Sequence, residues 1–304
     1  MCSDLENELL QSCDETYFSE EMKKHSSILI GGKVFALCYP KDIEEIKSII
    51  KTCQKFNFSF KVVGNSSNIL YDDSFMNLCV ISTIKLKGIN VNDESCTMTI
   101  MAGEMLANCY FVSQKLGYSG FERLSLIPGT IGAGAIINAG AYGKSLSDII
   151  KSVLVMTEFG EMITIQNEKL CYGYRSSMLQ HSGLIVIHVE VQLERLSKNI
   201  INSIEIECKK KRLESQPLLP SLGSVFKKIE ENLSAGQIID RAGLKGLKIG
   251  GLEISEVHAN FIVNRGNGTA KEFKHLVDLI KCTVKNKYNI DLVREVEYIT
   301  KENT

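Results

Sequence analysis

The chain has 304 residues, of which 44% are hydrophobic and 23% are charged. This length is about twice that of a typical domain, so two or three domains around a sizeable core are expected. Lysine and arginine together number 35 and aspartate and glutamate 36, so no basic surplus points to nucleic acid as a partner. The composition therefore predicts an ordinary globular protein, large enough to be an enzyme.

Ten cysteines are scattered along the chain without a C-x-x-C pair or the Cys/His spacing of a zinc site. We therefore expect reduced thiols that pack as small apolar residues, and no metal site. No apolar run approaches the ~18 residues of a membrane span, and the acidic start differs from a signal peptide. These features predict a cytoplasmic protein without membrane insertion.

The first part of the chain has the pattern of a β-α-β unit. Strands are predicted over residues 34–39 and 60–63, and between them a helix begins at about Lys41. The apolar side chains that recur at helical spacing are Ile43, Ile46, Ile49, Ile50 and Cys53.

From residue 77 to about 193 the pattern changes to short strands, with one helix near 105–116. The strands are expected at 78–83, 96–101, 153–156, 162–165 and 183–193. A third region follows, with helices predicted at 200–214, 235–242 and 270–287 and a strand at 259–264. The last strand, about 291–299, follows a helix and could return to the first region.

Gly64, Asn65, Ser66, Ser67 and Asn68 follow directly after an apolar strand. Such small residues let several backbone N–H groups point at one anion, so a phosphate or pyrophosphate would fit this turn. A tight polar turn between two strands would have the same composition, so both interpretations stay open at this point.

A second run, IPGTIGAGAIINAGAYGKS, has glycine or alanine at most positions from Gly129 to Gly143, where a cofactor ring could approach the backbone closely. Within it, residues 138–145 miss the phosphate-loop pattern G-x-x-x-x-G-K-[ST] only at the first position. Asn138 stands where the turn of a phosphate loop needs glycine. A nucleoside-triphosphate site is therefore a weaker interpretation of this run than a cofactor ring lying against it. No G-x-G-x-x-G follows a strand, which disfavours a Rossmann dinucleotide site.

Short motifs occur in order along nearly the whole chain. They are HSSILIGGKV (25–34), VVGNSSNIL (62–70), IPGTIGAGAIINAGAYG (127–143), YGYRSSM (172–178), GSVFKK (223–228), AGLKG (242–246), ISEVHANFIVN (254–264) and LVREVEYI (292–299). Together they resemble the UDP-N-acetylenolpyruvoylglucosamine reductase family, also called UDP-N-acetylmuramate dehydrogenases, which are FAD enzymes of bacterial peptidoglycan synthesis. The connections resemble the shorter family variant, which lacks an extra tyrosine-bearing loop.

The resemblance implies an α+β fold with three domains. Residues 1–72 would form the first FAD-binding domain, completed by the C-terminal strand at 290–304. Residues 73–195 would form the second FAD-binding domain, of the vanillyl-alcohol-oxidase type. Residues 196–289 would form a separate α+β substrate-binding domain.

The resemblance also implies the reaction. NADPH would reduce FAD by hydride transfer and leave, after which UDP-N-acetylglucosamine enolpyruvate would enter and take the hydride at its terminal carbon. The product would be UDP-N-acetylmuramate. We expect a monomer that binds no nucleic acid.

By match to the family motifs, the resemblance implies Ser224 as the proton donor, Arg175 as the residue that binds the substrate carboxylate, and Glu295 as the residue that stabilises the enol intermediate. It also implies that the Gly64 turn holds the FAD pyrophosphate and that the second glycine-rich run lies against the flavin. Arg212 falls where the family has an arginine near the flavin, but the basic run KKKRLES could equally be a solvated helix face, so both interpretations stay open. The implied FAD contacts are Gly64, Asn65, Ser66, Ser67, Asn68, Pro128, Gly129, Thr130, Gly132, Ala133, Asn138, Ala139, Gly140 and Arg212.

Four positions depart from the family pattern. Ser215 stands where lysine is usual, Lys228 where many members have asparagine or arginine, and Val257 where lysine is common. Glu297 stands where arginine is frequent. These differences affect details of binding rather than the chemistry. His258 is expected to be a hydrogen-bonded structural residue rather than a base.

Three other readings stay open. A non-catalytic flavin- or nucleotide-binding protein would keep the fold and lack turnover. A phosphotransferase built on residues 138–145 would bind ATP with magnesium and would not be yellow, and an oxidase on the same flavin fold would reduce oxygen rapidly. Retention of Ser224, Arg175 and Glu295 favours the reductase.

Overall fold

The computed structural model describes residues 2–230 and 233–301. The chain divides into two compact units, each built from segments that lie apart in the sequence. The first contains Met1–Phe18, Ala36–Asn65 and Cys79–Lys211, and the second contains Ser19–Phe35, Ser66–Leu78 and Arg212–Thr304. This division does not test the predicted boundaries of three domains, which stay a prediction.

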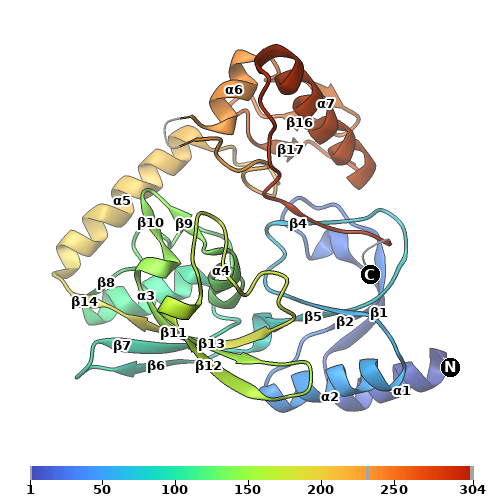
Figure 1. Cartoon of the computed structure of the whole chain (residues 1–304), viewed down its shortest axis with the longest axis vertical. Coiled ribbons are helices and arrows are strands. Elements are labelled where there is room, and N and C mark those ends of the chain that lie inside the picture. The colour runs from blue at the N-terminus through green and yellow to red at the C-terminus, as the bar shows by residue number, and fades with distance from the viewer. Residues whose placement is uncertain (1, 231–232, 302–304) are drawn as a thin grey trace. The chain divides into compact units, whose positions relative to one another are not determined.

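The predicted β-α-β unit near the N-terminus is confirmed as β2, α2 and β3, in a sheet with the order β1-β2-β5-β3. Helix α2 begins after Lys41 because Asp42 is its N-cap, whose carboxylate accepts the N–H of Glu45 at 2.9 Å. Helix α1, which was not predicted, packs beside α2 (Figure 1). The elements of this part are α1 (Cys2–Ser12), β1 (Thr16–Glu21), η1 (Met22–Lys24), β2 (Lys33–Cys38), α2 (Ile43–Lys55), β3 (Phe60–Val63), β4 (Ile69–Tyr71) and β5 (Met76–Ser82).

A five-stranded antiparallel sheet with the order β12-β11-β13-β7-β6 contains four of the strands predicted for the strand-rich region (Figure 1). Its strands are β6 (Ile89–Asn92), β7 (Thr97–Met101), β11 (Ile150–Met156), β12 (Met162–Gln166) and β13 (Ile185–Gln192). The strand predicted at 78–83 belongs instead to the N-terminal sheet, where it is β5 and pairs with β3. The predicted helix is α3 (Leu106–Leu116), which ends because Gly117 takes the left-handed conformation at φ 76°. Shorter elements are η2 (Thr83–Lys85), β8 (Tyr118–Ser119), β9 (Gly140–Ala141), β10 (Lys144–Ser145), η3 (Leu146–Asp148), η4 (Asn167–Lys169) and β14 (Glu194–Arg195).

Helix α4 (Ile131–Ile137) lies inside the second glycine-rich run and was not predicted. Gly132 and Gly134 each disfavour a helix by about 1 kcal/mol relative to alanine, so local propensity is against it. Tertiary packing decides instead, because α4 lies on strands β13 and β7. A Cβ added to Gly132 would lie 2.6 Å from the Cβ of Ala102, so this helix needs a small residue where it meets its neighbour.

The second unit packs helices α6 and α7 with a three-stranded sheet, order β15-β16-β17, around an apolar core (Figure 1). Helix α7 buries Phe273, Leu276 and Ile280, which recur three and four positions apart and so share one face. Strand β18 pairs in parallel with β4. The elements of this part are α6 (Ala235–Arg241), β15 (Lys248–Ile249), β16 (Leu252–Ile254), β17 (Ile262–Asn264), α7 (Ala270–Tyr288) and β18 (Glu297–Ile299).

The predicted helices of this region are confirmed, but two predicted strands are shorter than expected. Residues 259–261 form a turn instead of a strand, because the N–H of Phe261 donates to the carbonyl oxygen of His258 at 2.9 Å. Residues 291–296 are mostly irregular before β18 begins.

Helix α5 (Lys198–Ser215) confirms the predicted charged helix. Across residues 2–230 and 233–301, no helix combines the length and apolar character that a membrane crossing requires. The cysteines whose side chains are described are free thiols, and most are buried, which fits their predicted use as small apolar residues.

Candidate active site

Two segments that were predicted to hold FAD meet in the first unit. A Cβ added to Gly64, directly after β3, would lie 2.5 Å from Oγ1 of Thr130 and 2.9 Å from Cβ of Ala133. The side-chain N–H of Asn65 donates to the carbonyl oxygen of Pro128 at 3.0 Å. The turn after β3 therefore lies directly against the start of α4.

The start of α4 is held in a fixed conformation. Thr130 is fully buried and caps the helix, since its hydroxyl accepts the N–H of Ala133 at 3.4 Å. The N–H of Gly132 donates to the carbonyl oxygen of Ala102 at 3.0 Å. The N–H groups of Ile131 and Gly132 donate to carbonyl oxygens within the protein, so the start of α4 serves to hold the turn in place. The small residues of the turn after β3 fit a cofactor whose pyrophosphate is bound by backbone N–H groups.

We expect Gly64→Ala to weaken FAD binding about tenfold. The added methyl group must displace Thr130 or Ala133, and overpacking of this kind typically costs about 1–3 kcal/mol. Titration of the apoprotein with FAD, followed by flavin fluorescence, measures the effect. The double variant Gly64→Ala/Thr130→Ala should recover part of the affinity because it removes the nearer obstacle, and Thr130→Ala is measured alone to give the effect of losing the cap of α4. Wild-type affinity in Gly64→Ala would place FAD away from this turn.

Ser66, Ser67 and Asn68, predicted to contact FAD, belong to the second unit. The side-chain N–H of Asn68 donates to the carbonyl oxygen of Glu295 at 3.1 Å, and the N–H of Glu297 donates to the carbonyl oxygen of Asn68 at 3.0 Å. Asn68 therefore holds the backbone of the predicted enol-stabilising residue. Sequence reasoning missed this contact because the two residues are 227 positions apart.

Ser224 and Glu295 lie on neighbouring segments of the second unit. The N–H of Glu295 donates to the carbonyl oxygen of Val225, next to Ser224, at 2.8 Å. Gly223 turns the chain just before the serine with a φ of 75°, a conformation that favours glycine. Both predicted catalytic side chains are partly exposed. The structure thus places two of the three residues predicted to carry the chemistry on segments that are hydrogen-bonded to each other.

Arg175, the third predicted catalytic residue, lies in the first unit. Its guanidinium donates to the carbonyl oxygens of Asn138 and Gly140 at 3.3 and 2.6 Å. The side-chain N–H of Asn138 donates to the carbonyl oxygen of Gly173, in the loop that carries the arginine, at 2.9 Å. Arg175 and Asn138 have φ values of 51° and 48°, which persist only where surrounding bonds hold them. The arginine is therefore anchored on the backbone of the predicted flavin-binding run.

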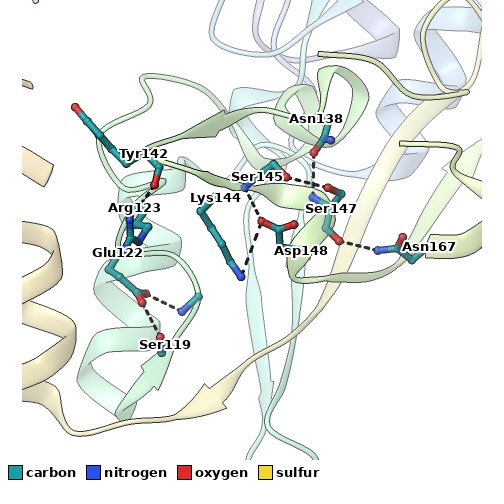
Figure 2. Close-up of polar contacts among 11 residues, drawn as sticks. Ser119, Glu122, Arg123, Asn138, Tyr142, Lys144, Ser145, Ser147, Asp148 and Asn167 are labelled. Atoms are coloured by element: carbon teal, nitrogen blue, oxygen red, sulfur yellow. Dashed lines mark hydrogen bonds and ion pairs between the residues drawn. The ribbon is translucent and has the colours of Figure 1, made fainter. Parts of the chain in front are cut away.

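Residues 138–145 do not form a phosphate loop. They contain the hairpin of β9 and β10, and Nζ of Lys144 lies 3.9 Å from Oδ2 of Asp148 (Figure 2). Ser145 precedes only the short turn η3, whose capping bonds it shares with Asp148. In a phosphate loop the lysine and serine would begin a helix whose N–H groups face the phosphates. The structure therefore disfavours the nucleoside-triphosphate interpretation.

Arg212 and the four departures from the family pattern are spread over the chain. Arg212 is partly buried in the last turn of α5, and Ser215 is the last residue of that helix. Lys228 and Val257 are exposed, and Glu297 is the exposed first residue of β18. Contacts of these side chains with FAD or substrate stay predictions.

His258 has the structural environment that was expected. Its Nδ1 accepts the N–H of Asn260 at 3.2 Å, and its ring meets that of Phe261 edge-on with the centroids 4.9 Å apart. Burial lowers the pKa of His258, which keeps the ring neutral and its Nδ1 able to accept. Asn260 in turn bonds to Phe226, a contact that no sequence pattern indicated.

The close-packed glycine-rich segments of the first unit fit a flavin-binding protein, and comparison with protein families shows that class. Residues 35–166 match the family described as FAD binding domain. Residues 214–299 match the C-terminal domain of UDP-N-acetylenolpyruvoylglucosamine reductase.

Curated relatives named UDP-N-acetylenolpyruvoylglucosamine reductase match nearly the whole chain. The protein from Alkaliphilus oremlandii is 36% identical over 95% of this chain and 95% of its own length. The protein from Lactobacillus acidophilus is 36% identical over 93% of this chain and 94% of its own. The crystal structure of UDP-N-acetylenolpyruvylglucosamine reductase from Thermus caldophilus has a TM-score of 0.79 and 30% identity, covering 94% of this chain and 98% of that one.

The chain belongs to the UDP-N-acetylenolpyruvoylglucosamine reductase family. It is therefore an enzyme, an oxidoreductase with FAD as its cofactor, as predicted. The predicted α+β fold, with an FAD-binding part and a separate C-terminal domain, is confirmed as well.

Proposed function

We propose that this protein uses NADPH and FAD to reduce UDP-N-acetylglucosamine enolpyruvate to UDP-N-acetylmuramate, a step of peptidoglycan precursor synthesis. The observation that carries the proposal is membership of the reductase family over nearly the full length of the chain. The hydrogen bond from the N–H of Glu295 to the carbonyl oxygen of Val225, the residue after Ser224, supports it. We further propose that the enzyme is a cytoplasmic monomer.

When bound, FAD supplies the hydride, which it takes from NADPH and delivers to the terminal carbon of the enolpyruvyl group. Addition at that carbon pushes electrons toward the carboxylate of the substrate. The protein must therefore stabilise negative charge on the carboxylate side and give a proton to the neighbouring carbon.

We assign the role of proton donor to Ser224. A serine hydroxyl does not titrate near neutral pH, so it donates a proton only to a strongly basic, carbanion-like acceptor. The α-carbon of the enolate that hydride addition produces is such an acceptor. Glu295, whose backbone lies beside that of the serine segment, is assigned to stabilise the enol form.

We assign binding of the substrate carboxylate to Arg175. Two of its N–H groups are engaged by the carbonyl oxygens of Asn138 and Gly140, which fixes the plane of the guanidinium. Charge-assisted, planar hydrogen bonding from a guanidinium suits a carboxylate well.

A visible absorption spectrum tests the proposed function. The purified protein is kept without oxygen and measured before NADPH, after NADPH, and after UDP-N-acetylglucosamine enolpyruvate. We expect NADPH to bleach the flavin bands and the enolpyruvyl substrate alone to restore them. Flavin that never recovers would favour a non-catalytic binding protein, rapid recovery with oxygen would favour an oxidase, and a protein that cannot be reconstituted with FAD would contradict the proposal altogether.

A further inference from the structure

The short segment that carries Ser224 is bound on one side by a buried asparagine. Asn260 is only 6% exposed, and its side-chain amide makes two bonds to one residue. Its Oδ1 accepts the N–H of Phe226 at 3.0 Å, and its Nδ2 donates to the carbonyl oxygen of Phe226 at 2.8 Å. Its own carbonyl oxygen accepts the N–H of Val225 at 2.8 Å. Three hydrogen bonds from Asn260 therefore hold the two residues that follow the serine.

On its other side the same segment is bonded to the residues around Glu295. The N–H of Glu295 donates to the carbonyl oxygen of Val225, and the N–H of Lys227 donates to the carbonyl oxygen of Val293, both at 2.8 Å. The backbone after Ser224 therefore lies between Asn260 and the segment that carries the second catalytic residue. A shift at Asn260 would move Ser224 relative to Glu295.

Asn260 is itself held in place. Its N–H donates to Nδ1 of His258, and a Cβ on Gly236 would lie 2.8 Å from Cε1 of that histidine. His258 therefore packs against the backbone of α6 and fixes the turn that presents the asparagine. These residues are distant from Ser224 in sequence, but their contacts converge on the two residues that follow it.

We propose that Asn260 is a positioning residue for the proton donor Ser224, an inference that rests on the proposed function. A primary amide presents one donor and one acceptor side by side, which matches the N–H and C=O of a single residue. An ionised carboxylate offers acceptors only, and a hydroxyl is too short to reach both groups. Asparagine is thus required by the geometry of the contact with Phe226.

Asn260→Asp tests this role, because it keeps the shape of the side chain and replaces the donor with an oxygen. That oxygen would face the carbonyl oxygen of Phe226, where the amide now donates at 2.8 Å. Asn264→Asp is the matched control. Asn264 is also 6% exposed and also donates to a backbone carbonyl at 2.8 Å, but its partner is Ile28 and not the serine segment.

Two measurements separate the role from a general loss of stability. In rapid mixing, Asn260→Asp should slow reoxidation of the reduced flavin by saturating enolpyruvyl substrate about 10- to 100-fold, since misplacement of a reacting group by about 1 Å can cost ~10²-fold. Reduction by NADPH should stay within about twofold of wild type, because the proton donor is not used in that step. The solvent deuterium isotope effect on reoxidation should rise, because proton delivery becomes slower.

The second measurement does not depend on turnover. Hydrogen exchange of the peptide covering residues 223–228 should be faster in Asn260→Asp than in Asn264→Asp. Equal exchange and equal reoxidation in the two variants would overturn the positioning role. If the aspartate variant does not fold, Asn260→Ser, which buries no charge, should show the same two changes. Wild-type protein that is never reoxidised by the substrate would contradict the proposed function, whereas the exchange result would still decide whether Asn260 holds the segment.

Discussion

Ser224→Ala is expected to slow reoxidation of the reduced flavin by UDP-N-acetylglucosamine enolpyruvate by ~100-fold or more, the usual effect of losing a general acid. Reduction of FAD by NADPH should be nearly unchanged, because hydride transfer from NADPH requires no proton from this hydroxyl. The side chain is partly exposed, so its removal leaves no large cavity. Anaerobic rapid mixing, with each half-reaction followed by flavin absorbance, measures both rates separately.

Ser234→Ala is the control for this variant. Ser234 is exposed and caps α6 in the same unit, where its hydroxyl accepts the N–H of Gln237 at 3.2 Å. Its loss should lower the free energy of unfolding by about 1 kcal/mol and leave both half-reactions as in wild type. If Ser224→Ala slowed the two half-reactions equally, Ser224 would have no special part in proton delivery.

Much of the fold could be predicted because several helices each bury one face. In α7, for example, the buried residues recur at helical spacing, and Thr269 marks the start of the helix as its N-cap. The pattern failed at α4, where two glycines oppose a helix locally and contact with Ala102 requires small residues. It also failed at residues 259–261, where a strand-like run of apolar residues is broken by the bonds of His258.

In the candidate site, too, local sequence patterns do not reveal contacts between distant residues. The sequence could identify the three predicted catalytic residues, because each lies in a short motif of neighbouring residues that resembles the family. They are Ser224, Arg175 and Glu295. Asn260 also lies in such a motif, but its partner Phe226 is 34 positions away. The spacing of residues does not reveal which distant carbonyl an amide will meet, so positioning residues are found only when the chain is folded.

Arg175→Lys is expected to raise the apparent dissociation constant for the enolpyruvyl substrate about 10- to 100-fold. Hydrogen bonds to charged groups contribute about 1.5–3 kcal/mol, and an ammonium is a point charge that cannot reproduce a planar, two-point grip on a carboxylate. It also cannot span the carbonyl oxygens of Asn138 and Gly140 that now orient the guanidinium. The concentration dependence of flavin reoxidation gives this constant directly.

Arg123→Lys is the matched control, because Arg123 lies in the same unit and its guanidinium also donates to a backbone carbonyl oxygen, that of Tyr142 at 2.8 Å (Figure 2). Arg123 has no assigned contact with substrate, so the Arg123→Lys variant should bind the enolpyruvyl substrate as tightly as wild type does. A methyl ester of the substrate sharpens the comparison, since it removes the carboxylate charge. Wild type should prefer the acid strongly and Arg175→Lys only weakly. If both proteins discriminate equally between acid and ester, the carboxylate is bound by another residue and Arg175 serves only the structure of its loop.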